Sequence, residues 1–283
     1  MRPVSPAERV RRRLRAEGLD EAAERVPARY ERLGSVLLLR LAESDRAFFG
    51  PIARGFRQEL GVSAVLRHAG PVRGEERALP TERLDGEATE TTVLEHGVRY
   101  RFDAARILFS RGNKTERSRI GGLVAPGERV VDLFAGIGYF TLPAARAHPT
   151  VQVEAVERNP VAFAYLEQNL RLNAVTDQVR AQLGDNRTVA LPEGTADRIL
   201  LGYLHSSLPW VPQTLRLLAP AGGWVHLHEL ADATAPDGAS LAAVEKAVER
   251  SGGRLREGTV RRVKNYGPGR VHVVVDAYVV PRR

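Results

Sequence analysis

The chain has 283 residues, which is enough for one catalytic domain of about 200 residues and a smaller companion domain. No apolar run is long enough to span a membrane, no secretory signal is visible, and the absence of Cys excludes disulfides, cysteine-ligated zinc and iron–sulfur clusters. The net charge of +8 suits RNA or an anionic small molecule, but 39 of the 42 basic residues are arginine, a bias that a GC-rich genome also produces. We expect a cytoplasmic protein that is a monomer or a weak dimer.

The first third of the chain indicates a charged N-terminal helical arm and a small α+β domain. Apolar periodicity predicts helices over 5–29 and 46–60, and strands over 35–41, 62–67, 91–95 and 98–102. His96-Gly97 joins the last two strands as a hairpin, whereas residues 70–84 read as a loop or an irregular hairpin. The predicted division is an arm over 1–30, an α+β domain over 31–104 and a larger domain over 105–283.

The larger domain begins with strands that alternate with helices. Short apolar runs over 130–134, 151–156 and 179–183 are separated by helical patterns, which indicates βαβ units and a parallel sheet. Ligands bind such sheets at the carboxyl ends of the strands. That edge here carries Asp132, Glu157 and Asp185, one acid for each strand, so we expect a ligand site there.

The residue types at this edge point to a nucleoside. Gly136 and Gly138 allow the backbone to turn tightly and to approach a ligand. Glu157 lies about 20 residues beyond them, the distance at which an acid accepts from ribose hydroxyls in dinucleotide folds. Asp185 is placed to accept from an adenine amino group. Thr141 replaces the third glycine of a dinucleotide motif and no phosphate-binding loop is present, which favours a nucleoside without phosphates. Strand-end turns and helix caps are the plain alternative.

Further elements follow in order. We predict helices over 115–123, 139–148, 209–218 and 241–251, strands over 197–201 and 222–230, and a closing hairpin of 255–263 with 270–280.

The motifs VDLFAGIGYFTLPAA, AVERNPVAFAYLEQNLRLNAV and GDNR resemble the S-adenosylmethionine (SAM) site of class I methyltransferases. With FDAARILFSRGNKTER and YGPGRVHVVVDAYVV, they resemble more narrowly the family of tRNA guanine-N1 methyltransferases and wybutosine-synthesising enzymes. The resemblance implies an α/β, Rossmann-like fold with a seven-stranded sheet, an antiparallel last strand and SAM as co-substrate. The cofactor-binding residues that it implies are Phe109, Ser110, Asn113, Arg117, Asp132, Phe134, Ala135, Gly136, Gly138, Glu157, Arg158, Asn159, Asp185, Asn186 and Gly202.

The loop after the fourth strand departs from the methyltransferase pattern. Gly202 stands where enzymes that methylate nucleic-acid nitrogen usually carry Asn. The sequences GYLHSS and WVHLHE resemble the branch that transfers the 3-amino-3-carboxypropyl (acp) group, in which the acceptor attacks Cγ of SAM and 5′-methylthioadenosine leaves. We expect catalytic roles for His205, Ser206 and Asp132: the first two, with Ser207, would hold the acp carboxylate, or His205 would act as a base, and Asp132 or Glu229 would receive the ammonium.

The spacing of His226 and His228 is compatible with a metal site, but structural roles fit better, and we predict no metal. The acceptor stays open. A small-molecule phenol, as in isonocardicin synthase of antibiotic biosynthesis, is favoured by compact size and composition. The alternatives are the wyosine-precursor base of tRNA(Phe), methylation of tRNA guanine, and an RNA-binding module whose SAM pocket has decayed.

Overall fold

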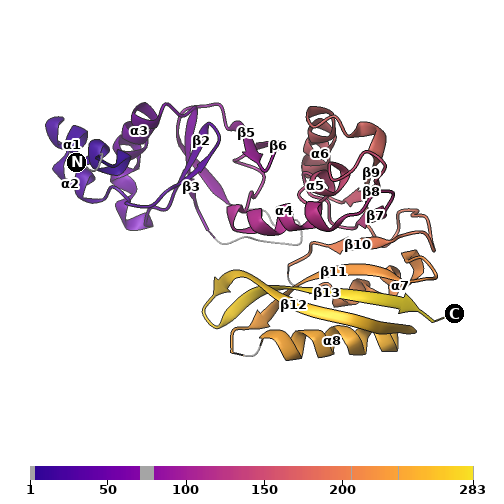
Figure 1. Cartoon of the computed structure of the whole chain (residues 1–283). Helices are drawn as coiled ribbons and strands as arrows, with labels where there is room; N and C mark the ends of the chain where they lie inside the picture. The colour runs from indigo at the N-terminus through magenta and orange to yellow at the C-terminus, as the bar shows by residue number, and fades with distance from the viewer. Residues whose placement is uncertain (1–3, 71–79, 205, 235, 283) are drawn as a thin grey trace. The chain divides into compact units, whose positions relative to one another are not determined.

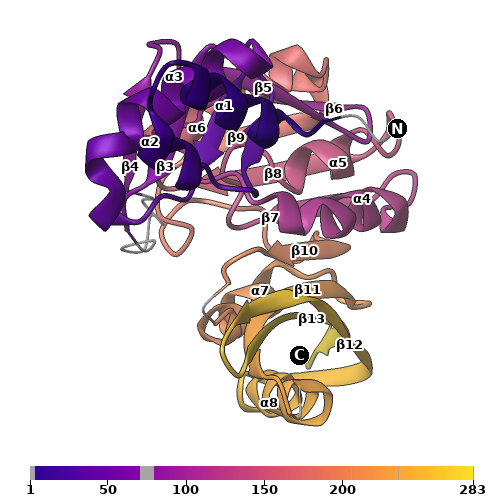
Figure 2. The ribbon, with the colours of Figure 1, turned by 90° about the vertical axis from the view of Figure 1, so that its left-hand side faces the viewer.

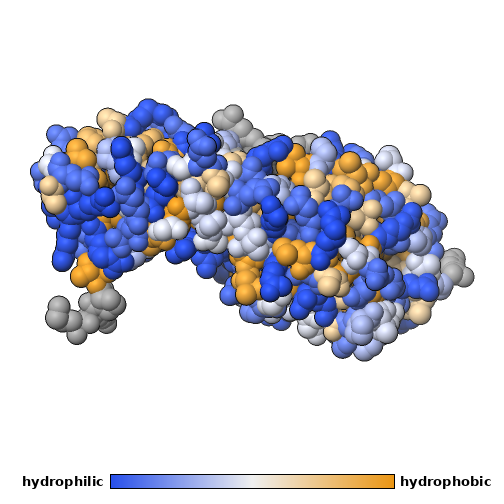
Figure 3. Space-filling view, turned by 90° about the horizontal axis from the view of Figure 1, so that it is seen from above, coloured by the Kyte–Doolittle hydropathy of each residue, from blue (hydrophilic) through white to orange (hydrophobic). Residues whose placement is uncertain are grey.

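A computed structural model describes residues 4–70, 80–204, 206–234 and 236–282 (Figure 1). The chain divides into two compact units, Met1–Phe109 and Ser110–Arg283. No helix in the described ranges is long and apolar enough to cross a membrane, and the face seen in Figure 3 is mainly hydrophilic.

The first unit combines short helices with a four-stranded sheet and a hairpin. Its helices are α1 (Pro6–Ala16), α2 (Asp20–Glu24), η1 (Glu43–Phe48) and α3 (Phe49–Leu60). Its strands are β1 (Glu31–Leu33), β2 (Val36–Leu39), β3 (Ala64–His68), β4 (Thr81–Asp85), β5 (Glu90–Glu95) and β6 (Val98–Asp103). The sheet has the order β1-β2-β3-β4, with β2 and β3 parallel, and β5 pairs separately with β6 in the predicted hairpin.

The N-terminal helices share the core of this unit. Val10 and Leu14 of α1 are buried in one cluster with Ile52 and Phe56 of α3. The structure therefore differs from the separate arm that the sequence suggested, because α1 and α2 bury their apolar faces against the rest of the unit. It also places strand β4 where we predicted only a loop or an irregular hairpin over 70–84; residues 71–79 of that prediction lie outside the described residues.

The second unit contains a seven-stranded sheet. Its strands are β7 (Arg129–Asp132), β8 (Gln152–Glu157), β9 (Val179–Leu183), β10 (Arg198–Leu201), β11 (Gly223–Asp232), β12 (Gly253–Gly267) and β13 (Arg270–Pro281). Its helices are η2 (Arg111–Asn113), α4 (Lys114–Leu123), α5 (Thr141–Ala145), α6 (Pro160–Leu172), η3 (Thr176–Gln178), η4 (Leu208–Trp210), α7 (Val211–Leu217) and α8 (Pro236–Arg250).

The strand order is β12-β13-β11-β10-β7-β8-β9. The five strands from β11 to β9 run parallel, and β13 is antiparallel to both β11 and β12. This is the predicted Rossmann-like sheet with an antiparallel last strand. Figure 2 shows β12 and β13 curving together beside α8, and three register shifts in their pairing accompany the bend.

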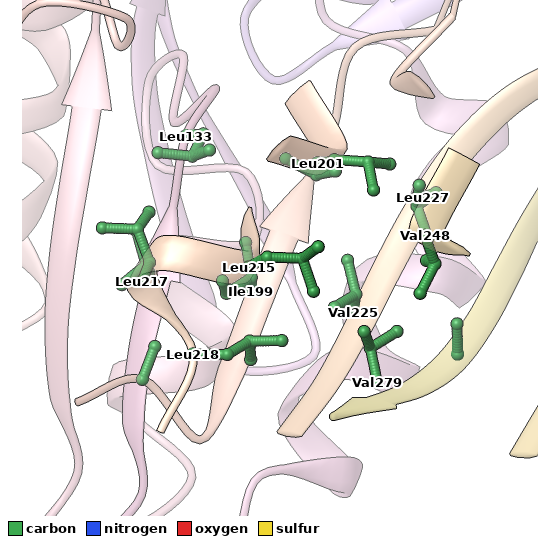
Figure 4. Close-up of a cluster of buried hydrophobic side chains, with 14 of the residues drawn as sticks. Leu133, Ile199, Leu201, Leu215, Leu217, Leu218, Val225, Leu227, Val248 and Val279 are labelled. Atoms are coloured by element: carbon green, nitrogen blue, oxygen red, sulfur yellow. The ribbon is translucent and has the colours of Figure 1, made fainter. Parts of the chain in front are cut away.

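One apolar core supports the sheet. Ile199 of β10, Val225 and Leu227 of β11, and Leu215 of α7 gather with Val248 of α8 in a single buried cluster (Figure 4). Val275 and Ala277 of β13 belong to the same cluster. Because side chains alternate along a strand, the intervening Asp276 points to the opposite face of the sheet, where α4 meets it. The core therefore fixes the strands whose carboxyl ends form the candidate site.

Candidate active site

The chain order reverses between β7 and β10, and the carboxyl ends of strands at such a switch point are where ligands bind in sheets of this kind. The loop after β7 contains both predicted glycines. Gly136 has φ +57°, and a Cβ there would lie 2.7 Å from the Tyr139 ring. Gly138 has φ +98°, and a Cβ there would lie 2.8 Å from Cγ of Leu142. Only glycine satisfies both the backbone angle and the space, so the loop forms a tight cradle.

Glu157 at the end of β8 braces this cradle. Its Oε2 accepts from the backbone N–H of Gly136 and its Oε1 from that of Asn159, each at 2.7 Å. A carboxylate has about four acceptor sites, and these two backbone N–H groups fix the orientation of the Glu157 side chain. The side chain of Asn159 caps α6 by accepting from the N–H of Val161 at 2.8 Å, so its structural contribution is a helix cap. Contacts of either residue with SAM stay predictions.

Asp132 lies beneath the cradle and is completely buried. It accepts from Oγ1 of Thr141 at 2.7 Å and from the N–H of Phe134 at 3.2 Å, and burial raises its pKa to about 6. Thr141, which replaces the third glycine of a dinucleotide motif, therefore ties α5 to the end of β7. These contacts give Asp132 a bracing role, and its catalytic role stays a prediction.

The loop after β9 is held from both sides. The side chain of Asp185 accepts from the N–H and the guanidinium of Arg187, which lowers the pKa of its carboxyl to about 2. Asn186 is buried; it donates to the carbonyl of Leu133 at 2.7 Å and accepts from Nε1 of Trp210 at 2.8 Å. Asn186 therefore joins three loops of the site. Exposed Arg158 adds positive charge near Asp185.

Three aromatic rings meet at the ends of β7 and β10. Phe134 stacks on Tyr203 with centroids 5.3 Å apart and meets Trp210 edge-on at 5.0 Å. Tyr203 and Trp210 are half-buried, and the sequence prediction did not include them. Tyr203 follows the end of β10 closely, a signal that becomes informative once β7 and β10 are known to be neighbours, whereas Trp210 lies in η4 and has no such signal in the sequence.

Gly202 is crowded by an aromatic ring. A Cβ at this position would lie 3.2 Å from Cε2 of Phe140. Position 202 therefore lacks the Asn side chain of the methyltransferase pattern, and the Phe140 ring also limits the space for any side chain there. Phe140 was also absent from the predicted set.

The remainder of this loop is organised by Glu229 at the end of the parallel-paired part of β11. Its Oε1 accepts from the N–H of Ser207 at 2.5 Å, and it also accepts from the hydroxyl of Ser206 and the N–H of Leu208. Burial raises the pKa of Glu229 to about 7 despite these donors. Ser207 Oγ lies 3.0–3.1 Å from three backbone carbonyl oxygens, and its single hydroxyl proton is shared among them. His205, the predicted carboxylate ligand or base, lies outside the described residues.

The segment that begins the second unit carries three more predicted residues. Arg117 donates to the carbonyl of Ser110 at 3.1 Å, and its guanidinium lies 5.8 Å from the Tyr139 ring centroid, so it is next to the cradle. Ser110 Oγ accepts from Nζ of Lys264 at 2.6 Å. Asn113 has a buried Oδ1 that accepts no hydrogen bond from the described residues, as expected for a group that awaits a ligand N–H. Phe109 belongs to the first unit, where it stacks on Phe102 at 4.9 Å.

A buried polar network fastens α4 to the sheet. Arg119 donates to both oxygens of Asp276 at 2.8 and 2.9 Å and also pairs with Glu116. His226 Nδ1 meets the same carboxylate at 2.5 Å, and Arg198 donates to His226 Nε2 at 2.7 Å. Because the Arg198 guanidinium can only donate, Nε2 of neutral His226 is the acceptor and its proton lies on Nδ1, which donates to Asp276.

The neighbouring His228 Nδ1 lies 2.9 Å from His272 Nε2. His226 and His228 are therefore occupied by protein partners. In the part of the chain that the structure describes, no three His, Asp or Glu side chains are grouped as a metal site.

Comparison with known proteins identifies the family of this chain. Residues 91–255 match the model of the TRM5/TYW2 methyltransferase domain, which is more than half of the chain. The chain belongs to this family. It is 35% identical over 279 residues to a tRNA(Phe) (4-demethylwyosine(37)-C(7)) aminocarboxypropyltransferase of Pyrococcus horikoshii, covering 99% of each protein.

Solved structures agree with the sequence comparison. The crystal structure of P. horikoshii TYW2 in complex with MeSAdo has a TM-score of 0.86 and 33% identity, covering 97% of this chain and 99% of that one. Methanocaldococcus jannaschii TYW2 in complex with AdoMet has a TM-score of 0.73 and 31% identity, covering 89% and 100%. The predicted family and the predicted fold class are confirmed.

The comparisons also weigh the two acceptors that the sequence left open. The P. horikoshii relative carries tRNA(Phe) in its name, whereas neither it nor the two solved structures above is named for a phenol or an antibiotic. The alternative acceptor, the wyosine-precursor base, is better supported than the favoured phenol.

Proposed function

We propose that this chain transfers the acp group of SAM to C7 of the 4-demethylwyosine base at position 37 of tRNA(Phe). The chain is a SAM-dependent aminocarboxypropyltransferase, and SAM is its co-substrate, as in its relatives. The loop after β10 provides the observation that favours transfer of the acp group over transfer of the methyl group. Gly202 provides no amide to receive an N–H at the methyl, and the Phe140 ring limits the space in which such a side chain would stand.

The residues of the site fit SAM. The glycine cradle accommodates a ligand that approaches the backbone closely, Glu157 presents a carboxylate at the strand end where ribose is bound in related folds, and Asn113 Oδ1 is a buried acceptor for an amino or ammonium group. SAM supplies a sulfonium leaving group, so Cγ is open to in-line attack. The chain's contribution is then mainly alignment of Cγ with the acceptor carbon.

The loop of Ser206 and Ser207 is the best-placed segment to set that alignment. Glu229 accepts from both residues and so fixes the loop at the end of β10, beside Gly202. With its donors turned towards Glu229, Ser206 acts as a positioning residue in this structure. We propose that the backbone of this loop and His205 contact the acp carboxylate.

A flat, tricyclic acceptor base fits the aromatic residues of the site. Tyr203 is half-buried and stacked on Phe134, so the two rings and Trp210 form a rigid apolar wall at the end of β10. Stacking of a base on such side chains stabilises binding by about 1–3 kcal/mol. The net charge of +8 is compatible with an RNA acceptor.

The test uses SAM labelled separately in the methyl carbon and in the carboxyl carbon. The acceptor is tRNA(Phe) that carries 4-demethylwyosine, and unmodified tRNA(Phe) is the control. We expect the carboxyl label in tRNA and release of 5′-methylthioadenosine only with the modified tRNA. Methyl label in tRNA with release of S-adenosylhomocysteine would instead establish the methyltransferase alternative, and transfer to a phenol but not to tRNA would restore the small-molecule acceptor.

A further inference from the structure

We propose that strand β12 and its turn into β13 form a docking surface for the phosphate backbone of the acceptor RNA. This inference rests on the proposed function, because it assigns the surface that holds the tRNA. The surface, called here the basic edge, consists of Arg254, Arg256, Arg261, Lys264 and Arg270. It lies entirely within the second unit, at one edge of the seven-stranded sheet.

Positive charge is concentrated on this strand. Residues 253–270 contain six basic residues and one acidic residue, so 18 residues carry five of the eight net positive charges of the chain. A compositional bias towards arginine would spread the 42 basic residues over all 283 positions. It does not explain one basic residue in every three along a single edge strand. The concentration therefore points to a polyanionic partner.

The arginine side chains are available for binding. Arg254, Arg256, Arg261 and Arg270 are exposed, and the described residues hold no ion pair that involves any of them. Arg270 donates to the carbonyl of Leu230 at 2.7 Å and lies opposite the exposed Asp232, whose pKa its charge helps to lower. The charges without a carboxylate partner among the described residues are therefore those of Arg254, Arg256 and Arg261.

Protection of the sheet edge is the plain explanation for charged side chains on an edge strand. The opposite edge of the same sheet shows what such protection looks like. Strand β9 is five residues long and carries one arginine, Arg180, which is paired with Glu154 at 3.5 Å. Strand β12 has 15 residues and several uncompensated charges, which is more than edge protection requires.

The register turns part of the basic edge towards the face that carries α4. Arg261 pairs with Val274 and Arg254 with Val280, two positions that share a face with Asp276, the residue to which α4 is tied. The other face is covered, because a Cβ at Gly258 would lie 2.5 Å from Leu241 of α8.

The end of β12 leads to the candidate active site. Nζ of Lys264 donates to Ser110 at 2.6 Å, and a Cβ at Gly112 would lie 2.9 Å from the side chain of Lys264. Ser110 is in turn held by Arg117 beside the cradle. Tyr266, two residues further along the chain and 42% exposed, adds an aromatic face on which a base can stack. An RNA strand that follows the basic edge is therefore directed towards the site.

The experiment removes three charges without touching the site. The edge variant is R254Q/R256Q/R261Q. The matched control is R146Q/R171Q/R180Q, which replaces three exposed arginines near the opposite edge of the sheet, at the end of α5, in α6 and in β9 respectively. Affinity for tRNA(Phe) is measured at several salt concentrations, and affinity for SAM is measured on the same preparations. We expect the edge variant to bind tRNA about tenfold to a hundredfold more weakly, and its salt slope to fall by about three, one for each phosphate contact. SAM affinity and the turnover rate at saturating tRNA should stay at the wild-type values, and the control should bind tRNA nearly as the wild type does.

Equal losses of tRNA affinity in the two variants would show that binding depends only on the net charge of the protein, and would overturn the docking surface. Wild-type affinity in the edge variant would overturn it as well, while the proposed function would stand if the labelled acp group still reaches tRNA. If wild-type protein binds tRNA through this edge but transfers no acp group to it, the surface stands and the proposed function fails.

Discussion

Replacement of Asp276 by Asn tests whether the buried network fastens α4 to the sheet. The Asp276 carboxylate accepts two bonds from Arg119 and one from His226, and its side chain is 10% exposed. Burial opposes its ionisation, but the bonds from His226 and Arg119 outweigh this and lower its pKa to about 2, compared with an ordinary value of 3.8. That difference is equivalent to roughly 2 kcal/mol of folding free energy at neutral pH.

Loss of one member of a buried pair typically costs about 3–5 kcal/mol, but Arg119 keeps its bond to Glu116. We therefore expect D276N to lower the free energy of unfolding of the second unit by about 2–3 kcal/mol. Because the folded-state pKa is depressed, the contribution of Asp276 is complete above the ordinary pKa and is lost as pH falls towards 2. The difference between wild type and D276N should fall to roughly half near pH 3.

The assay is urea unfolding followed by tryptophan fluorescence between pH 7 and pH 3. Both tryptophans, Trp210 and Trp224, lie in the second unit, so the signal reports the part of the chain that contains the network. The control is D177N at an exposed carboxylate, which should change stability by less than about 0.5 kcal/mol. A pH-independent difference, or a D276N effect as small as that of D177N, would refute the assigned role of the network.

Three further predictions concern the site itself. Glu157→Ala should weaken SAM binding by about 1.5–3 kcal/mol in calorimetry through loss of charge-assisted hydrogen bonds, and unchanged affinity in a folded variant would remove Glu157 from the site. Gly136→Ala should lower SAM affinity at least about tenfold because its Cβ meets Tyr139, whereas Gly127→Ala, also at positive φ but with no neighbour within 4 Å, should bind SAM normally; equal losses would disprove the cradle. Glu229 has its pKa raised to about 7 by burial, and its ionised form accepts from the loop, so the rate of acp transfer should rise with pH through about 7; persistence of this limb in Glu229→Gln would assign it to another group.

The sequence by itself determined the sheet and the position of the cradle. The apolar runs over 130–134 and 151–156, with Gly136 between them and Glu157 directly after the second, specify consecutive βα units, and all the signals needed lie within some 30 residues of chain. Local patterns also identified the closing hairpin, although β12 extends through Gly267, beyond the predicted end at residue 263. Such features depend on backbone geometry and periodicity, which neighbouring residues settle among themselves.

Tertiary structure decided which side chains meet. Arg119 and Asp276 are 157 positions apart, and their pairing depends on the register of β13 and on the face of the sheet that α4 covers. Likewise, Asn186, which read as a cofactor ligand, joins Leu133 to Trp210, because β9, β7 and η4 converge only in the folded sheet. A sequence pattern specifies a period and a face but not the partner across the sheet. Partners are chosen by packing and by the need of each buried polar group for a hydrogen bond.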